Sequence, residues 1–548
     1  LGPGGLRAAA IAASWFSVQA DYRGASFPVS RSLPERGDAV VLAMGVDSVP
    51  GLTMPRVDGP TLALLPNPTD AFGTLLVIAG RSEADLIAAA QAMVAGRAAL
   101  TGEIARVVAP TIPGRQPYDS PRWIRTDQPV TLGSLVAREE LQSAGYSPGP
   151  IRIPVRTAPD LLTWRNRGFP VSLEYRSPIG PIIDVSASRL DAAFSGAYLR
   201  SFRLADPEWI PPVTAALDWV MQQIGLTSET RSGRVVIPHY LVLGRDELQL
   251  RFDMRPLARG DCVAVPADVR AAVEPGSTVD LRRGYRHARM PNLGFFASSG
   301  FPFTRMADLS GMAVVLPERA NPVELGAFLD VVGQLAATVG VASTGIQVVT
   351  PGGLPSAATR DLLVIGTLGR QPALGTLFRD APLRVEGDRL TLAAPDALQD
   401  IRSLFLGAPG SAERGRATTL LNEASGEGLA ALLGGESPLQ FGRSVLAITG
   451  VTPAAITQMV AALTDPALAP RIQGDLAILS GGRMESFRTA TPYSVGRLPW
   501  WLLPQVWLAE RPERMLLIML ASAALVGVSL FWILRRRALS RLRARTNS

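Results

Sequence analysis

The pattern that decides the fold occurs twice, as Leu75-Leu76-Val77-Ile78-Ala79-Gly80-Arg81-Ser82 and as Val445-Leu446-Ala447-Ile448-Thr449-Gly450-Val451-Thr452. Each copy is a short apolar strand, a glycine and a hydroxyl residue suited to cap a helix. An alanine-rich helix follows, which we expect to run through Val94 in the first copy and through Leu463 in the second. The chain therefore contains an internal duplication.

A second pair of matching segments precedes the first pair in each half. Gly37 to Gly45 resembles Arg360 to Gly369, since both place an acid before a short apolar strand and a glycine after it. Two copies of a strand-helix alternation in the same order predict two α/β domains with largely parallel sheets, doubly wound and flavodoxin-like in their spacing.

The two halves differ at their beginnings. The later copy has a strand, Met312 to Leu316, before the helix Val323 to Val339, whereas the earlier copy begins directly with the helix Leu6 to Ala20. We therefore expect the opening strand of the first domain to lie upstream of Leu1, in a removed or longer precursor segment.

Between the halves, the apolar period changes from helical to two. Half-buried antiparallel strands separated by Pro/Gly turns predict a β-sandwich of jelly-roll type, interrupted by one amphipathic helix. The strand candidates are Ile151 to Arg156, Val171 to Tyr175, Ala197 to Leu204, Val235 to Leu243 and Glu247 to Met254, and the helix is Val213 to Ile224.

The C-terminal region contains a membrane anchor by length and composition. Met515 to Leu534 is uncharged and long enough to cross a bilayer, with Leu520, Leu525 and Leu530 along it. Six arginines follow it without an acid, so the positive-inside rule places the tail in the cytoplasm and the bulk of the chain outside.

The segment before the anchor, Pro499 to Leu508, suits an amphipathic helix on the membrane surface. Trp500, Trp501 and Trp507 supply the aromatic residues of a membrane interface. We expect six parts in the chain: an α/β domain (1–112), a β-sandwich (113–286), a second α/β domain (287–490), a linker with the interfacial helix (491–513), the anchor (514–535) and a basic tail (536–548).

Charge and composition exclude several classes of function. The six tail arginines account for most of the net charge of +7, so the folded part has no electrostatic footprint for nucleic acid. One cysteine, Cys262, excludes an internal disulfide, and His239 and His287 are too few and too far apart in sequence for a histidine metal site. We expect Cys262 and His239 to be packed residues.

The α/β halves lack the loop that binds phosphate. A nucleotide site needs backbone N–H groups at a helix start, but the loop before the second-domain helix is Pro317-Glu318-Arg319-Ala320-Asn321-Pro322. Two prolines remove donors and Glu318 adds negative charge, so we expect no flavin, dinucleotide or other cofactor.

The β domain offers residues for two kinds of carbohydrate site. Hydrolysis needs two carboxylates facing a cleft, and the available acids, Glu174, Asp184, Asp191 and Glu208, form no recognisable pair. Sugar rings stack on exposed aromatic rings. The candidates are Trp123, Trp164, Phe169 and Tyr175, with Trp209 and Tyr240 also in this domain, although any one of them also suits a buried core. Trp123 and Trp164, flanked by polar residues, look most like surface residues.

One run resembles a known family. Leu293-Gly294-Phe295-Phe296-Ala297-Ser298-Ser299-Gly300-Phe301-Pro302-Phe303-Thr304-Arg305-Met306-Ala307-Asp308-Leu309-Ser310, leading into the strand at Met312, is similar to the membrane-anchored periplasmic subunit of bacterial cellulose synthase. The order of the expected parts agrees with that family over the whole chain. The family has a further carbohydrate-binding-like jelly roll upstream of the region that corresponds to Leu1.

The resemblance implies a non-catalytic inner-membrane protein with its bulk in the periplasm. Such a subunit would stabilise the glucosyltransferase subunit through the anchor and guide nascent β-1,4-glucan. Membrane lipid and further copies of the chain, bound through the periplasmic domains, are the other expected partners. Members of the family are often labelled cyclic di-GMP-binding. Arg282 and Arg286 match the Arg-x-x-x-Arg part of the receptor pattern, but Ala313 replaces the glycine required after Asp308 and Ser310. A direct cyclic di-GMP receptor and a periplasmic glycan hydrolase remain the alternatives.

Overall fold

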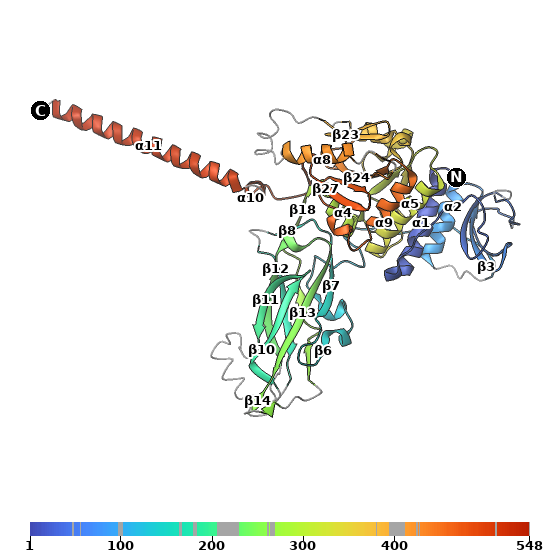
Figure 1. Ribbon diagram of the computed structural model, residues 1–548, viewed down its shortest axis with the longest axis horizontal. Helices are drawn as coiled ribbons and strands as arrows, with labels where there is room; N and C mark the ends of the chain where they lie inside the picture. Colours follow the sequence, from blue (N-terminus) through green and yellow to red (C-terminus); the bar gives the residue numbers. More distant parts are fainter. Residues whose placement is uncertain are drawn as a thin grey trace.

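The computed structural model describes residues 1–548 except 46–48, 55, 97–101, 164–166, 179–182, 205–229, 260–261, 264–268, 380, 394–410, 424–425, 427, 510–511 and 547–548. The two segments of mixed helix and sheet lie side by side, the strand-rich segment between them in sequence extends away from them, and one long C-terminal helix projects from the folded parts (Figure 1). The expected helix Val213 to Ile224 lies outside the described residues.

The first α/β segment is a four-stranded sheet with two helices on one face. Apolar side chains of both helices cover Leu62 and Ile78, and a loop containing Leu52, Met54 and Val57 covers the other face. Its elements are α1 (Pro3–Ala20), β1 (Ala39–Met44), β2 (Thr61–Asn67), β3 (Asp70–Gly80), α2 (Glu83–Ala95) and β4 (Ile104–Arg106), in the sheet order β1-β3-β2-β4.

The expectation of a largely parallel sheet is wrong for this segment. Only β1 and β3 run parallel, whereas β2 is antiparallel to both β3 and β4. The reason is local, because Asn67 and Asp70 pair across a two-residue turn, and so short a connection can join only antiparallel strands.

The second α/β segment has a seven-stranded sheet covered on both faces, ordered β20-β19-β21-β25-β24-β26-β27. The first four strands of this order are parallel, and the last three alternate in direction. Its elements are α4 (Leu293–Ser299), β19 (Met312–Val315), α5 (Pro322–Val339), β20 (Gln347–Val349), β21 (Asp361–Ile365), α6 (Ala373–Leu377), β22 (Leu383–Glu386), β23 (Arg389–Leu392), α8 (Ser411–Glu423), β24 (Ala430–Glu436), β25 (Ser444–Gly450), α9 (Pro453–Ala462), β26 (Leu476–Ser480) and β27 (Arg483–Phe487).

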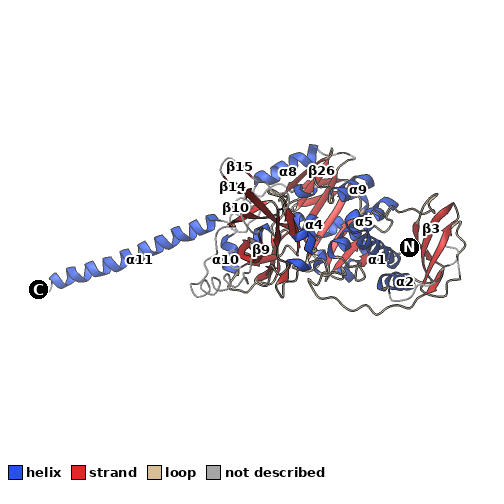
Figure 2. Cartoon of the chain, turned by 90° about the horizontal axis from the view of Figure 1, so that it is seen from below, coloured by secondary structure: helices blue, strands red, loops and turns tan. Residues whose placement is uncertain are grey.

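The duplication is confirmed by the strand pairings. β1 pairs parallel with β3 as β21 does with β25, β2 is antiparallel to β3 as β24 is to β25, and β4 adds to β2 as β26 adds to β24. The helices after β3 and β25 are capped alike, by Ser82 and Thr452, whose side chains accept from backbone N–H groups three residues on. The equivalent helices α1 and α5 pack against each other between the two sheets (Figure 2).

The middle segment is a sandwich of two antiparallel sheets with an apolar core between them. One sheet has the order β11-β10-β13-β7, and β9 is at the centre of the other, where it pairs with β12, β16 and β17. The strands are β5 (Val130–Thr131), β6 (Gln142–Ala144), β7 (Ile151–Arg156), β9 (Phe169–Arg176), β10 (Ile183–Phe194), β11 (Ala197–Arg203), β12 (Thr230–Ile237), β13 (Arg245–Pro256), β14 (Ala258–Arg259), β15 (Cys262–Val263), β16 (Arg270–Val273) and β17 (Thr278–Val279).

A small sheet joins the three parts of the chain. Its order is β28-β18-β8, where β8 (Leu161–Thr163) belongs to the sandwich, β18 (Gly284–Met290) leads into the second α/β segment and β28 (Tyr493–Gly496) leads out of it. The chain continues into α10 (Leu503–Ala509) and then α11 (Pro512–Thr546). The position of α10 is therefore tied to the folded domains through β28. Short 3₁₀ turns complete the fold: η1 (Asp21–Arg23), η2 (Leu132–Ser134), η3 (Arg138–Leu141), η5 (His239–Leu241), η6 (Phe303–Arg305), η7 (Pro351–Ala357), η8 (Leu368–Arg370) and η9 (Ala469–Arg471).

Candidate functional site

Three of the four predicted glycan contacts are buried, so the prediction of surface contact is wrong for them. Phe169 and Tyr175 lie on the inward face of β9, in the core of the sandwich. Trp123 is buried where the sandwich meets the second α/β segment, in a cluster with Ala288 and Val339. Its neighbour Arg122 helps to hold this junction, since it donates to the Ala337 carbonyl across it, whereas Arg125 forms an exposed ion pair with Asp127. Trp164 and Trp209 lie outside the described residues.

The acids considered for hydrolysis are divided between the two sheets. Glu174 is in β9, whereas Asp184 and Asp191 are in β10 of the opposite sheet, and all three alternate with buried residues. Asp191 pairs with Arg189, and hydrogen bonds from Ser186 and Ala187 lower the pKa of Asp184. A carboxyl that is ionised more readily than usual is poorly suited to act as a general acid. Glu208 lies outside the described residues.

The carboxyl ends of β19 and β21, where a doubly wound sheet usually binds its ligand, are filled by the protein itself. Glu324, fully buried in the first turn of α5, accepts from Asn321 N (2.9 Å) and Thr367 N (3.1 Å). Gln371 Nε2 donates to the Val315 and Ile365 carbonyls at the ends of the two strands. The N–H groups that would hold a phosphate here bind an internal carboxylate.

The two arginines of the receptor-like pattern already have partners. Arg282 forms a two-pronged ion pair with Asp280, at 2.8 and 3.0 Å. Arg286 pairs with the buried Asp160 at 2.8 Å and lies over the Tyr118 ring, 3.8 Å from its centroid. The Tyr118 hydroxyl also donates to Asp160 at 2.5 Å, and burial together with that carboxylate raises the pKa of the tyrosine. Arg286 therefore supports the fold, whereas Arg282 forms an exposed local ion pair.

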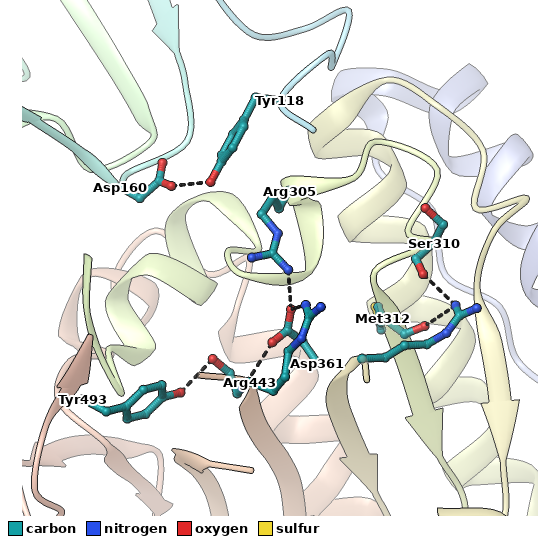
Figure 3. A network of polar contacts seen from close by, with 10 residues as sticks. Tyr118, Asp160, Arg305, Ser310, Met312, Asp361, Arg443 and Tyr493 are labelled. Carbon is teal, nitrogen blue, oxygen red and sulfur yellow. Dashed lines mark hydrogen bonds and ion pairs between the residues drawn. The ribbon is translucent and has the colours of Figure 1, made fainter. Parts of the chain in front are cut away.

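Polar contacts join parts of the second α/β segment to one another and to β28 (Figure 3). Arg305 and Arg443 both bind the buried Asp361, at 3.2 and 3.4 Å. Close by, the Tyr493 hydroxyl of β28 donates to the Gly435 carbonyl and lies 2.7 Å from Ser444 Oγ. The run 293–310 thus contributes Arg305 to a structural network.

The C-terminal helix carries apolar side chains that no described part of the chain covers. Within α11, the part Glu513–Leu539 contains an 18-residue stretch with a mean hydropathy of 2.4 and no buried residues. Its predicted anchor residues are all exposed, as are three tryptophans before it; these residues are Met515, Leu520, Leu525, Leu530, Leu534, Trp500, Trp501 and Trp507. A second apolar helix, α5, passes the same length test but is mostly buried within its domain.

A cavity of about 440 Å³ opens where the sandwich, β18, α4 and α10 meet. Its walls are mostly apolar, formed by residues such as Leu161, Val242, Phe295, Leu502 and Val506. Several polar groups interrupt these walls: Thr163, His239, Tyr240, His287, Arg289, Asn292 and Gln505. Both histidines of the chain are in this lining, and burial lowers the pKa of His239.

This cavity was not predicted from the sequence, but one signal for it exists. Leu502, Val506 and Ala509 share a helical face of α10 with Gln505, a polar residue among apolar ones. A polar group on an apolar helix face usually marks a specific contact. Tyr240 is one of the six aromatic residues of the β domain that were considered for contact with a glycan. Among those six, it is the one that the structure both describes and shows to be exposed.

Comparison with protein-family models finds three matches. The first FD domain of cellulose synthase BcsB matches residues 1–107, its second CBM domain matches 129–278, and its second FD domain matches 286–448. The matches agree with the order of α/β, β-sandwich and α/β segments seen in the structure.

Similar curated proteins extend over nearly the whole chain. "Cellulose synthase 2" of Novacetimonas hansenii is 36% identical over 541 residues, which cover 98% of this chain and 33% of the relative. "Cyclic di-GMP-binding protein" of Komagataeibacter xylinus is 34% identical and covered to 66%, and the protein of the same name in Pseudomonas fluorescens SBW25 is 34% identical and covered to 71%. The chain spans about a third of the synthase and about two thirds of the separate proteins.

Proposed function

Because the chain belongs to the cellulose synthase BcsB family, we propose that it is a non-catalytic accessory subunit that holds a membrane-embedded glucosyltransferase and guides nascent β-1,4-glucan away from it. One observation carries the proposal: α11 exposes an uncovered apolar surface directly after a short helix tied to the folded domains through β28. Such a helix can cross a bilayer and also pack against the spans of a partner.

The proposal includes a location and a domain assignment. The arginines in the C-terminal part of α11 favour a cytoplasmic tail, with the bulk in the periplasm of an inner membrane. We assign residues 1–112 and 287–490 to flavodoxin-like domains and 113–286 to a jelly roll. The support is the parallel order β20-β19-β21 for the second of these domains, the matching parallel pairs β1–β3 and β21–β25 for the first, and the two facing antiparallel sheets for the jelly roll. Residues 491–513, 514–535 and 536–548 are the interfacial linker, the anchor and the tail. Self-association remains a prediction.

The test measures polymer synthesis by the complex. Membranes containing the glucosyltransferase subunit and this chain should convert UDP-glucose to β-glucan, and deletion of residues 515–548 should abolish the product. A variant with an unrelated apolar span keeps the chain on the membrane and serves as the control. Normal synthesis after the deletion would contradict the accessory role.

Direct binding of cyclic di-GMP is the second candidate, favoured by the names of two relatives. The internal pairing of Arg282 and Arg286 argues against it, and we propose that the name describes the assembled synthase. Calorimetry of the purified chain with saturating cyclic di-GMP should give no binding heat; a saturable signal would establish a receptor. Hydrolase activity has no support from the carboxylates described above.

A further inference from the structure

We infer that the cavity beside α10 binds a short segment of a neutral β-linked glucan, an inference that rests on the proposed function. A volume of about 440 Å³ is within the usual range of small-ligand sites, roughly 300–1,000 Å³. The cavity lies against the helix that precedes the anchor, so it would meet a polymer close to the membrane surface.

The chemistry of the lining suits a sugar chain. A pyranose ring presents apolar C–H faces and a rim of hydroxyl groups, and the cavity combines apolar walls with side chains that donate or accept hydrogen bonds. Neither aspartate nor glutamate is among the described lining residues. Since glycoside hydrolysis needs a pair of carboxylates, such a site can hold a glucan without cleaving it.

Gln505 points independently to a polar ligand. Its Oε1 is buried and accepts no hydrogen bond from any described residue, although a buried acceptor without a donor is destabilising. A sugar hydroxyl can supply that donor. An acyl chain would leave this amide, Asn292 and Tyr240 in apolar surroundings, and an anionic group would find only one guanidinium, that of Arg289, in the described lining.

Tyr240 supplies an aromatic ring on the rim of the cavity. Its side chain is 66% exposed and meets His239 edge to face, with ring centroids 6.0 Å apart. The loop that follows it is rigid, because Asp246 accepts from Leu243 N and Gly244 N at 2.9 Å and Ser298 Oγ donates to the Leu243 carbonyl at 2.6 Å. A backbone that is already ordered loses little entropy on binding.

The chain offers a matched control for this ring. Tyr198, in β11 of the same sandwich, is 68% exposed but is not among the cavity residues. If any exposed aromatic ring could bind the glucan, removing either tyrosine would lower the affinity equally. If the cavity is the site, only the removal of Tyr240 lowers the affinity.

The experiment titrates the detergent-solubilised full chain with cellohexaose by calorimetry. Tyr240→Ala and Gln505→Met should each weaken binding about tenfold, whereas Tyr198→Ala should leave affinity within about twofold. No variant should lower the unfolding midpoint below that of the wild type. Unchanged affinity in both cavity variants, or an equal loss in Tyr198→Ala, would overturn the site.

A wild-type chain that does not bind cellohexaose at the highest soluble concentration would also overturn it. That result is distinguishable from failure of the accessory role, because synthesis would still depend on residues 515–548. If the chain bound anionic vesicles but not cellohexaose, and Tyr240→Ala abolished the binding of vesicles, the cavity would be assigned to lipid. This result would also contradict the inference.

Discussion

Arg282 and Arg286 show why a short motif does not reveal its own role. Both fit a nucleotide-receptor pattern in sequence, yet Arg282 is an exposed partner of Asp280, and Arg286 lies between the buried Asp160 and the Tyr118 ring. Asp160 and Tyr118 lie in distant stretches of sequence, so neither contact could be read from the residues around the arginines. The difference between the two arginines in their contribution to stability can be measured.

We predict that Arg286→Ala lowers the free energy of unfolding by about 3 kcal/mol, because it leaves Asp160 charged and buried without its cation. Arg282→Ala, its matched control, should lower it far less, since exposed ion pairs contribute little. Denaturant unfolding followed by circular dichroism compares them. Equal losses would contradict the structural role of Arg286.

His239 gives the cavity rim a dependence on pH. Burial lowers its folded-state pKa below the ordinary 6.5, so the neutral ring is favoured in the folded chain. The stabilising effect is complete above pH 6.5 and is lost as pH falls from there through the lowered pKa. We predict that the unfolding midpoint of the wild type falls more between pH 7.5 and 5.5 than that of His239→Gln. If the unfolding midpoints of the two proteins changed with pH in parallel, His239 would not contribute to the pH dependence of stability.

At the scale of elements, the α1–α5 contact depends on small residues. A Cβ added to Gly333 of α5 would overlap Ser17 Oγ of α1 and lie 3.1 Å from the Phe27 ring. A Cβ added to Gly415 of α8 would meet no atom within 4 Å. Both glycines are inside helices, so helix propensity favours alanine equally at the two positions.

We therefore predict opposite signs for one substitution. Gly415→Ala should stabilise the chain by about 0.5–1 kcal/mol, through helix propensity alone. Gly333→Ala should destabilise it by about 1–3 kcal/mol, because overpacking outweighs that gain. Thermal unfolding midpoints of the two variants test this prediction. If Ser17→Ala partly restores the midpoint of Gly333→Ala, Ser17 is the residue that obstructs the added methyl group. If alanine raised the stability at both positions, α1 and α5 would have to move apart at little cost, which would contradict the prediction.

The repeated elements were predictable because the signals are local. Ser82 and Thr452 each follow a strand and a glycine, and both cap helices as expected. Strand direction was missed in the first segment because the turn at Pro68-Thr69 is a weaker signal than the apolar runs beside it. The burial of Trp123 was also beyond prediction, since it depends on Ala288 and Val339 from distant elements. The cavity requires α10 to fold back onto β8 and β18, which no local pattern specifies.

At the scale of the whole molecule, β28 is the only described strand between the second α/β sheet and the anchor. It pairs with β18 from His287 to Met290, and Arg497 N extends this pairing by donating to the Arg286 carbonyl. Movement of the anchor would therefore be transmitted to the sandwich and to the cavity together. This coupling has a function only if the folded domains and the polymer are on the same side of the membrane.

Orientation can be tested by labelling single cysteines, after the native Cys262 is replaced by serine. Phe72 is 96% exposed on the β2–β3 hairpin, so Phe72→Cys should react in spheroplasts with a membrane-impermeant maleimide. Ser548→Cys follows the arginine-rich end of α11 and should react only after detergent is added, because cationic flanks stay in the cytoplasm. Phe441→Cys, exposed in the second α/β segment, controls for local accessibility and should behave like Phe72→Cys. The reverse pattern would place the cavity on the cytoplasmic side, where no extruded glucan could reach it, and would contradict both the accessory role and the glucan site.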